Sequence, residues 1–237
     1  MNIMDIKKFE IKKMNGIGFQ ATNVGIGIGI IEKMKRENAI VFFGFTANLV
    51  ASGIRGLIAD WVRKKSVDVI VTTGGALDHD IIKAYSPYLL GSFYENDTQL
   101  HQKGINRIGN ILVPNDRYEL LEEKMKPVFE KCYEKYGGAV SPSEIAYEMG
   151  LKIKDEHSFL KWASKNKIPV FCPGITDSAI GLQTYFFKQK RKDFGIDVTK
   201  DMKNLADIAL NAEKTGAVIL GGGISKHHII GVNLMRG

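Results

Sequence analysis

Residues 216–230 have the sequence Gly-Ala-Val-Ile-Leu-Gly-Gly-Gly-Ile-Ser-Lys-His-His-Ile-Ile, in which an apolar run leads through three glycines into a basic cluster. The run 216–220 predicts a buried strand, and the residues after the glycines predict the start of a helix. Glycines at such a junction let a ligand approach the backbone, and the first turn of the helix offers free amide groups to an anion. The pattern therefore predicts a ligand site where a parallel strand meets a helix.

The same order of elements occurs in the first third of the chain. Residues 39–45 and 67–73 predict buried strands, and residues 49–65 between them predict one amphipathic helix. The second strand leads into a glycine turn and a helical segment at 74–80. Strand, helix, strand, glycine turn and helix together indicate an α/β fold with a parallel sheet.

Further elements extend this pattern over the whole chain. Residues 20–35 predict a helix, and its glycines at 25, 27 and 29 permit close packing. Residues 116–162 are predicted to be mostly helical, with the start of one helix at the Ser-Pro-Ser-Glu of 141–144. A strand and turn follow at 168–174, and a last helix at 201–214. The turn after 174 brings Asp177 to the same sheet edge as the other glycine turns. We expect residues 1–237 to form a single α/β domain with a doubly wound, mostly parallel sheet.

Composition excludes several classes of protein. No run approaches the 18 apolar residues of a membrane-spanning helix, and the first residues lack the apolar centre of a signal peptide, so we expect a cytoplasmic protein. The net charge of +7 comes from basic residues scattered among acidic ones, which does not indicate direct binding to nucleic acid. Two cysteines, Cys132 and Cys172, are too few for a disulfide framework, and we expect both to be reduced thiols.

Three of the predicted strand ends carry the polar groups that a nucleotide site uses. They are Thr73-Gly74-Gly75 followed by Asp78-His79-Asp80, then Thr176-Asp177, then Gly221-Gly222-Gly223 followed by Lys226-His227-His228. Glycine turns admit a pyrophosphate, and a carboxylate accepts both hydroxyls of a ribose, for which Asp177 is the best-placed residue. A G-x-G-x-x-G sequence with an acidic residue about twenty positions later does not occur, so the ordinary Rossmann fingerprint is absent.

Several of these side chains also have a structural interpretation. Asp78 and Asp80 either cap the first turn of their helix or contact a ligand, or do both. One ring of the pair His227 and His228 faces a cleft as a polar or acid–base group, while the other packs or bonds to backbone. Adjacent residues at a helix start point in different directions, so residues 78–80 do not indicate a metal site.

Six blocks of sequence resemble deoxyhypusine synthases over almost the whole chain. They are Gly-Phe-Gln-Ala-Thr-Asn at 18–23, Thr-Ala-Asn-Leu-Val-Ala-Ser-Gly-Ile-Arg at 46–55, Val-Ile-Val-Thr-Thr-Gly-Gly at 69–75, Gly-Ile-Asn-Arg-Ile-Gly-Asn-Ile-Leu-Val-Pro at 104–114, Ile-Pro-Val-Phe-Cys-Pro at 168–173 and Gly-Gly-Gly-Ile-Ser-Lys-His-His-Ile at 221–229. Together these blocks are far more specific than any single glycine motif. The block at 72–75 followed by Leu-Asp-His-Asp resembles archaeal members more than animal ones.

The resemblance implies an NAD-dependent transfer of the aminobutyl group of spermidine to one lysine of the precursor of translation initiation factor 5A. In this chemistry NAD takes a hydride from spermidine and an enzyme lysine captures the butylamine part as a Schiff base. The lysine of the protein substrate then replaces the enzyme lysine before the final reduction. The resemblance also implies a tetramer whose active sites lie at subunit interfaces.

The resemblance assigns individual residues to the two ligands by position. The positions on NAD-contacting segments are Ala47, Asn48, Ala51, Thr73, Gly74, Gly75, His79, Asp177 and Gly222. The positions that face the polyamine are Asp78, His79 and His227. A cationic polyamine suits the carboxylate of Asp78, and His227 is the candidate catalytic residue, because it can orient the amine or help to move a proton. His79 stands where animal members have a carboxylate.

Three features depart from the family pattern. The family continues beyond the position of Arg236 with an acidic segment and a Trp-Gly-Lys motif that carries the nucleophilic lysine, so we expect a domain that is C-terminally incomplete. Lys226 does not replace that lysine, because the family has a lysine at this position as well. Leu182 stands where a carboxylate would contact spermidine, and Gly231 stands where the family often has asparagine. Agmatine is therefore an alternative substrate.

Two further functions stay open. The first is a non-catalytic or partner-dependent subunit, which would contribute half of a site to a complete homologue in a hetero-oligomer. The second is a transferase similar to homospermidine synthase, which would use putrescine as the acceptor. Because the missing sheet edge would expose apolar surface, we also expect the chain to aggregate or to associate with a partner.

Overall fold

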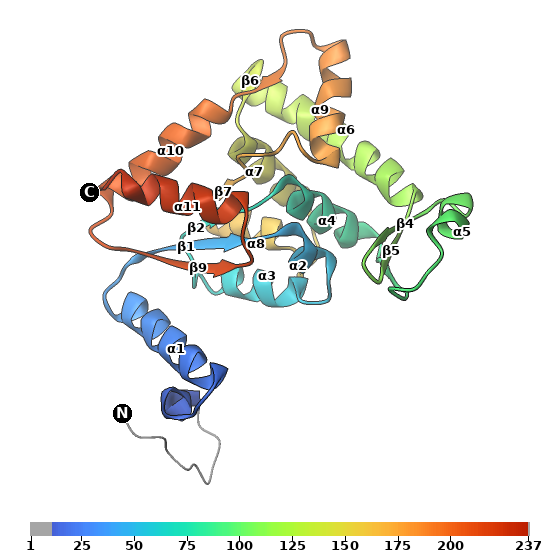
Figure 1. Cartoon of the computed structure of the whole chain (residues 1–237). Coiled ribbons are helices and arrows are strands. Elements are labelled where there is room, and N and C mark those ends of the chain that lie inside the picture. The colour runs from blue at the N-terminus through green and yellow to red at the C-terminus, as the bar shows by residue number, and fades with distance from the viewer. Residues whose placement is uncertain (1–10, 237) are drawn as a thin grey trace.

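The computed structural model describes residues 11–236 and has a four-stranded parallel sheet at its centre (Figure 1). The strands are β1 (Ile40–Phe45), β2 (Val69–Val71), β7 (Val170–Phe171) and β9 (Thr215–Leu220), in the spatial order β7–β2–β1–β9. The chain moves outward from β1 to β2 and β7 and then places β9 on the other side of β1. This reversal confirms the predicted doubly wound sheet, and the carboxyl ends of all four strands meet at one edge.

Helices cover both faces of this sheet. The larger layer contains α2 (Ala47–Ala51), α3 (Arg55–Arg63), α4 (Gly74–Tyr85), α6 (Asp116–Tyr136), α7 (Pro142–Lys152), α8 (Phe159–Asn166) and α9 (Ala179–Lys190). The opposite layer contains α10 (Val198–Asn211) and α11 (Ile224–Leu234). Side chains of β1 alternate between the two cores, since Phe43 and Phe45 lie in the larger core and Phe42 lies in the smaller one.

Two small sheets were not predicted from the sequence. β3 (Leu89–Leu90), β5 (Ile111–Pro114) and β4 (Ile105–Ile108) form an antiparallel sheet next to α5 (Asp97–Gln102), and β6 (Ala139–Val140) pairs in parallel with β8 (Gly195–Ile196). Figure 1 shows the antiparallel sheet extending from the body of the molecule beyond α4. Strands of two to four residues carry too little periodicity to be distinguished in a sequence.

The first described elements extend away from the sheet, which the end of α1 contacts at β9. η1 (Ile11–Gly16) packs against α1 (Gln20–Arg36), and the pair extends away from the body of the molecule (Figure 1). A side chain at Gly25 would overlap the backbone of Asn15, so the predicted close packing is confirmed for this glycine. The space around Gly27 and Gly29 is open.

Three expectations about individual elements are wrong. Residues 49–65 form two helices instead of one, because Ser52 adopts an extended conformation and its hydroxyl donates to the carbonyl oxygen of Leu49. The glycines at 74 and 75 form the first residues of α4 and not a turn before it. β9 is half-buried instead of buried, because it lies at the sheet edge, where α1 contacts it through Met34 against Gly216.

Other local predictions are confirmed. α7 begins with a capping box, in which Ser141 Oγ accepts from the amide of Glu144 at 3.3 Å and the Glu144 carboxylate accepts from the amide of Ser141 at 2.9 Å. Cys132 and Cys172 are buried free thiols. Within residues 11–236, every helix is too short or too polar to cross a membrane.

Candidate cofactor and substrate site

Four strand ends carry the predicted cofactor-binding residues to the carboxyl edge of the parallel sheet. Ala47, Asn48 and Ala51 lie in α2 directly after β1, Thr73, Gly74 and Gly75 follow β2, Asp177 follows β7, and Gly222 follows β9. These segments are up to 175 positions apart in the sequence, from 47 to 222. The parallel sheet makes them neighbours.

Two glycines at the start of α4 allow close contact with the neighbouring strand ends. A side chain at Gly74 would overlap Ser178, and the Cβ of Gly75 would lie 3.0 Å from the Cβ of Ala47. Both contacts involve atoms close to the backbone, which cannot easily move aside. Gly74 therefore joins the end of β2 to the turn that carries Asp177, and Gly75 joins it to α2.

The glycines after β9 differ from one another. Gly221 and Gly223 have φ angles of 99° and 71°, a backbone region that favours glycine. A Cβ at Gly221 would also lie 3.0 Å from Oγ1 of Thr46, so this turn packs on the end of β1. At Gly222 neither a positive φ angle nor close packing requires a glycine, because nothing lies within 4 Å of the position of its Cβ. Its surroundings leave space for a ligand next to the backbone.

The same edge presents hydrogen-bond donors that suit an anion. Thr73 precedes the first turn of α4 without capping it, and its Oγ1 is buried and has no partner among residues 11–236. α11 begins directly after Gly223, likewise without a side-chain cap. The first amides of a helix and its positive dipole end favour a phosphate. The carboxylate of Asp177 is exposed beside this edge.

Asp78 is buried and connects two helices. Its carboxylate oxygens accept from the amides of Ala179 at 2.9 Å and Ile180 at 3.0 Å, so it caps α9 together with Ser178. Of the two alternatives for Asp78, capping of its own helix is therefore wrong, because its side chain points to the neighbouring helix. Burial raises the pKa of the Asp78 carboxyl to about 6, despite the two amide bonds.

His79 is half-buried and contacts Tyr88, a residue that the sequence analysis did not identify. The Nδ1 atom of His79 is 2.8 Å from the Tyr88 hydroxyl, and the two rings meet edge to face. Burial, followed by the charge of Lys83, lowers the pKa of His79 to about 4, so the ring is neutral at neutral pH. A Cβ at Gly75 would lie 4.0 Å from Nε2, which places this nitrogen next to the glycines of the cofactor segment.

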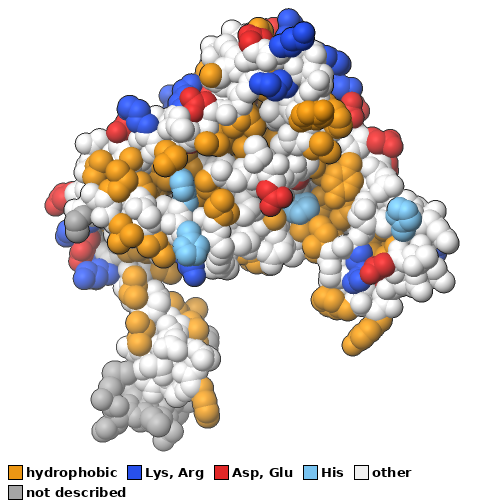
Figure 2. Space-filling model, turned by 45° about the horizontal axis from the view of Figure 1, so that its top comes forward, with side chains coloured by type: hydrophobic (Ala, Val, Ile, Leu, Met, Phe, Trp, Pro, Cys, Tyr) orange, Lys and Arg blue, Asp and Glu red, His pale blue; other side chains and the backbone are white. Residues whose placement is uncertain are grey.

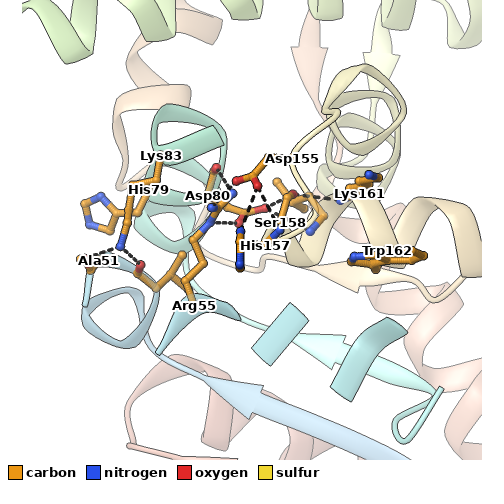
Figure 3. A network of polar contacts seen from close by, with 12 residues as sticks. Ala51, Arg55, His79, Asp80, Lys83, Asp155, His157, Ser158, Lys161 and Trp162 are labelled. Atoms are coloured by element: carbon orange, nitrogen blue, oxygen red, sulfur yellow. Dashed lines mark hydrogen bonds and ion pairs between the residues drawn. The ribbon is translucent and has the colours of Figure 1, made fainter. Parts of the chain in front are cut away.

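Asp80 belongs to a buried ionic network (Figure 3). Its carboxylate accepts from Arg55 Nε at 2.6 Å, from the hydroxyl of Ser158 at 2.6 Å and from the amide of Leu160 at 3.1 Å, while Arg55 also pairs with Asp155 at 2.6 Å. The network joins α3, α4 and the start of α8. Asp80 therefore has a structural role, but the proposed alternative that it caps its own helix is wrong, because its carboxylate accepts from α3 and from the start of α8.

The two histidines of α11 lie at the opposite layer of helices. His227 is exposed and His228 is half-buried, and burial lowers the pKa of His228. Both line a pocket of about 340 Å³ between α10 and α11, together with apolar side chains such as Met202 and Met235. Figure 2 shows hydrophobic side chains gathered around histidines on this part of the molecule. The glycine contacts that join the four strand ends do not include His227.

No group of three or more His, Cys, Asp or Glu side chains between residues 11 and 236 is arranged to hold a metal ion. The residues that the sequence analysis missed act through backbone or through another side chain. Arg55 pairs with Asp80, Tyr88 contacts His79, and Lys83 donates to three carbonyl groups of α2 and the residue after it. Only the helical spacing of His79 and Lys83, four positions apart, was a signal in the sequence.

Comparisons with known proteins agree with this architecture. Residues 11–237 match the family model for deoxyhypusine synthase. A probable deoxyhypusine synthase of Thermococcus onnurineus is 47% identical over 237 aligned positions, which cover 93% of this chain and 71% of that protein. One of Methanocaldococcus jannaschii is 46% identical, with 98% of this chain and 74% of that protein covered.

A solved structure gives the same result at the level of the fold. A crystal structure from Entamoeba histolytica, described provisionally as a deoxyhypusine synthase, superposes with a TM-score of 0.72 at 26% identity. The match covers 92% of this chain and 76% of that chain. With a family model that spans nearly all residues and relatives that are close to half identical, the chain belongs to the deoxyhypusine synthase family, whose members are transferases.

Proposed function

We propose that the chain forms the cofactor- and amine-binding part of a cytoplasmic deoxyhypusine synthase. The reaction is the NAD-dependent transfer of the aminobutyl group of spermidine to a lysine of the precursor of translation initiation factor 5A. Family membership supports the reaction class. The observation that carries the cofactor assignment is the convergence of four strand ends through Gly74, Gly75 and Gly221 at one sheet edge.

The groups at this edge suit NAD. The unpartnered hydroxyl of Thr73 and the first amides of α4 and α11 would hold the pyrophosphate, with Gly222 leaving room for it. The exposed carboxylate of Asp177 would accept the hydroxyls of a ribose. Asn48 lies in α2, which follows the end of β1. When bound, NAD supplies the acceptor for a hydride from the carbon next to the substrate amine and returns that hydride later.

Asp78 and His79 would bind the amine beside the cofactor. At neutral pH the Asp78 carboxylate is ionised, since its pKa of about 6 lies below this range, and an anion attracts a polyamine. The neutral ring of His79 accepts a hydrogen bond at Nε2 when Nδ1 donates to Tyr88, so a cationic amine favours this tautomer. His227 remains the proposed group for orienting the amine or moving a proton.

We propose further that an associated subunit completes the site and contributes the nucleophilic lysine. The half-buried state of β9 supports an additional covering element at that edge. In a partner-dependent subunit the same surface would be covered by a complete homologue. The assembly would be a tetramer or a hetero-oligomer.

The test is to incubate the chain with NAD, spermidine and the factor 5A precursor, alone and mixed with a full-length homologue whose NAD site has been disabled by mutation. The proposal expects the chain to bind NAD in calorimetry and the precursor to gain an aminobutyl group in the mixture, detected by mass spectrometry. Modification only in the mixture would identify a partner-dependent subunit. Absence of both NAD binding and modification would overturn the proposal.

Two changes to the assay identify the amine donor and the acceptor. Replacing spermidine with agmatine tests the alternative donor that Leu182 suggests. Omitting the protein acceptor and adding putrescine tests the transferase similar to homospermidine synthase. Formation of free homospermidine would favour that function over modification of the translation factor.

A further inference from the structure

Lys83 makes three hydrogen bonds to the end of the short helix α2. Its Nζ donates to the carbonyl oxygens of Val50 at 3.0 Å, Ala51 at 2.7 Å and Ser52 at 2.6 Å, and Figure 3 shows Lys83 reaching toward Ala51. An ammonium group has three donors, so these contacts use its full capacity. The carbonyl groups at the end of a helix otherwise lack partners within the helix.

α2 depends on such contacts for its position. It has only five residues, and a helix of this length is not stable without tertiary packing. α4 holds it at two places that are eight positions apart, with Gly75 against Ala47 at the start of α2 and Lys83 at its end. The same helix α4 carries Asp78 and His79.

We propose that Lys83 is a positioning residue of the NAD site, which holds α2 against α4 so that Ala47, Asn48 and Ala51 lie at the cofactor edge of the sheet. This inference rests on the proposed NAD site. Lys83 acts through the backbone of residues 50–52 and is not assigned a contact with the cofactor.

The surroundings of Lys83 make this contact sensitive to pH. The charged and titratable groups that face it are Arg55 from α3, His79 and Asp80 from α4, and the ring of Tyr88 at 5.7 Å. Burial, followed by the charge of Arg55, lowers the pKa of Lys83 to about 8. Deprotonation removes the charge and one of the three donors, so α2 is held most firmly below this pH.

The experiment measures NAD affinity of the full chain by calorimetry between pH 7 and about pH 9.5, for the unaltered chain and for Lys83→Met, Lys83→Arg and Lys188→Met. Lys188 is the matched control, because its Nζ also donates to a backbone carbonyl, that of Phe194 at 2.8 Å, at the far end of α9. We expect Lys83→Met to weaken NAD binding at pH 7 about 10- to 100-fold, as for the loss of a charged hydrogen bond. Lys83→Arg should recover part of the affinity, and Lys188→Met should bind as the unaltered chain does.

The pH profile separates positioning from general stability. Affinity of the unaltered chain should fall as the pH rises through about 8, and Lys83→Met should show no such fall. Asp78 and His79 have pKa values of about 6 and about 4, so they do not titrate in this range. Equal affinity and an equal pH profile for Lys83→Met and the unaltered chain would overturn the inference.

The failure of the proposed function has a different signature. If the unaltered chain binds no NAD at any pH, the NAD site itself is wrong and the inference falls with it. If Lys83→Met does not fold, as judged by circular dichroism, the pH dependence of NAD affinity in the unaltered chain tests the inference. An affinity that stays constant from pH 7 to about pH 9.5 would then contradict the role of Lys83.

Discussion

Asp78 carries a charge in a buried place, so its ionisation opposes folding. We expect Asp78→Asn to flatten the fall in stability between about pH 4 and pH 6. The unfolded carboxyl loses its proton near its ordinary pKa of 3.8, whereas the folded one keeps it to about 6. Over this range the folded state binds more protons, so rising pH removes up to about 3 kcal/mol from the free energy of unfolding.

Urea unfolding at pH 4, 5 and 6 measures this effect. Asparagine does not titrate, so the difference between the two proteins should change with pH and then stay constant above about pH 6. The variant also loses one acceptor for the amides of Ala179 and Ile180, which lowers its stability at every pH by about 1–3 kcal/mol. Identical pH slopes for the two proteins would contradict the buried charge.

Gly74 and Gly222 distinguish packing from ligand binding. Gly74→Ala places a Cβ against Ser178 and should lower the free energy of unfolding by about 1–3 kcal/mol. Gly222→Ala meets open space, so we expect stability within about 0.5 kcal/mol of the unaltered chain but NAD affinity reduced at least about tenfold. Chemical denaturation and calorimetry measure the two quantities.

The matched control for Gly222 is Gly27→Ala. Gly27 also has open surroundings, but it lies in α1, away from the sheet edge. This variant should bind NAD normally and unfold at an equal or slightly higher urea concentration, because alanine favours a helix. If Gly222→Ala binds NAD as Gly27→Ala does, the open space at Gly222 is not part of the cofactor site.

At the scale of elements, the capping box at the start of α7 should contribute to stability but not to NAD binding. Ser141→Ala removes the acceptor for the Glu144 amide and should lower the free energy of unfolding by about 1 kcal/mol. Because Ser141 is not one of the proposed cofactor-binding residues, NAD affinity should not change. A combined loss of stability and affinity would mean that α7 and the cofactor edge are coupled.

Elements with a local signal were the predictable part of the fold. The capping box of α7 and the apolar run of β1 lie within a few neighbouring residues, and both are confirmed. The break between α2 and α3 was not predicted, because Lys83 and Gly75 hold α2 from another helix. Periodicity alone continues through Ser52 as one amphipathic helix.

The candidate site also has a part that the sequence predicted and a part that it did not. Glycines and polar residues at the ends of parallel strands could be assigned to one edge from the sequence, because topology alone brings these ends together. The partners of Asp78 and Asp80 could not, since the amides of α9 and the hydroxyl of Ser158 lie 101 and 78 positions away. Side-chain direction at the start of α4 depends on how the helices pack, which no local pattern contains.

At the scale of the whole molecule, apolar surface remains outside the two cores. α1 exposes Val24, Ile26, Ile30 and Ile31 to between 42% and 53% of their full area. The pocket between α10 and α11 adds further apolar side chains, and β9 is half-buried. Exposed apolar side chains in such number indicate a site of association.

We therefore expect the chain to self-associate, with α1 in the contact. The double variant Ile26→Lys and Ile30→Lys should shift the mass measured by light scattering after gel filtration toward that of a single chain, because two charges cannot be buried without partners. Leu57→Lys on α3 is the control, since Leu57 is more exposed, at 68%, but lies outside α1. A single-chain mass for the unaltered protein at every concentration would contradict association, and equal masses for the double variant and the control would remove α1 from the contact.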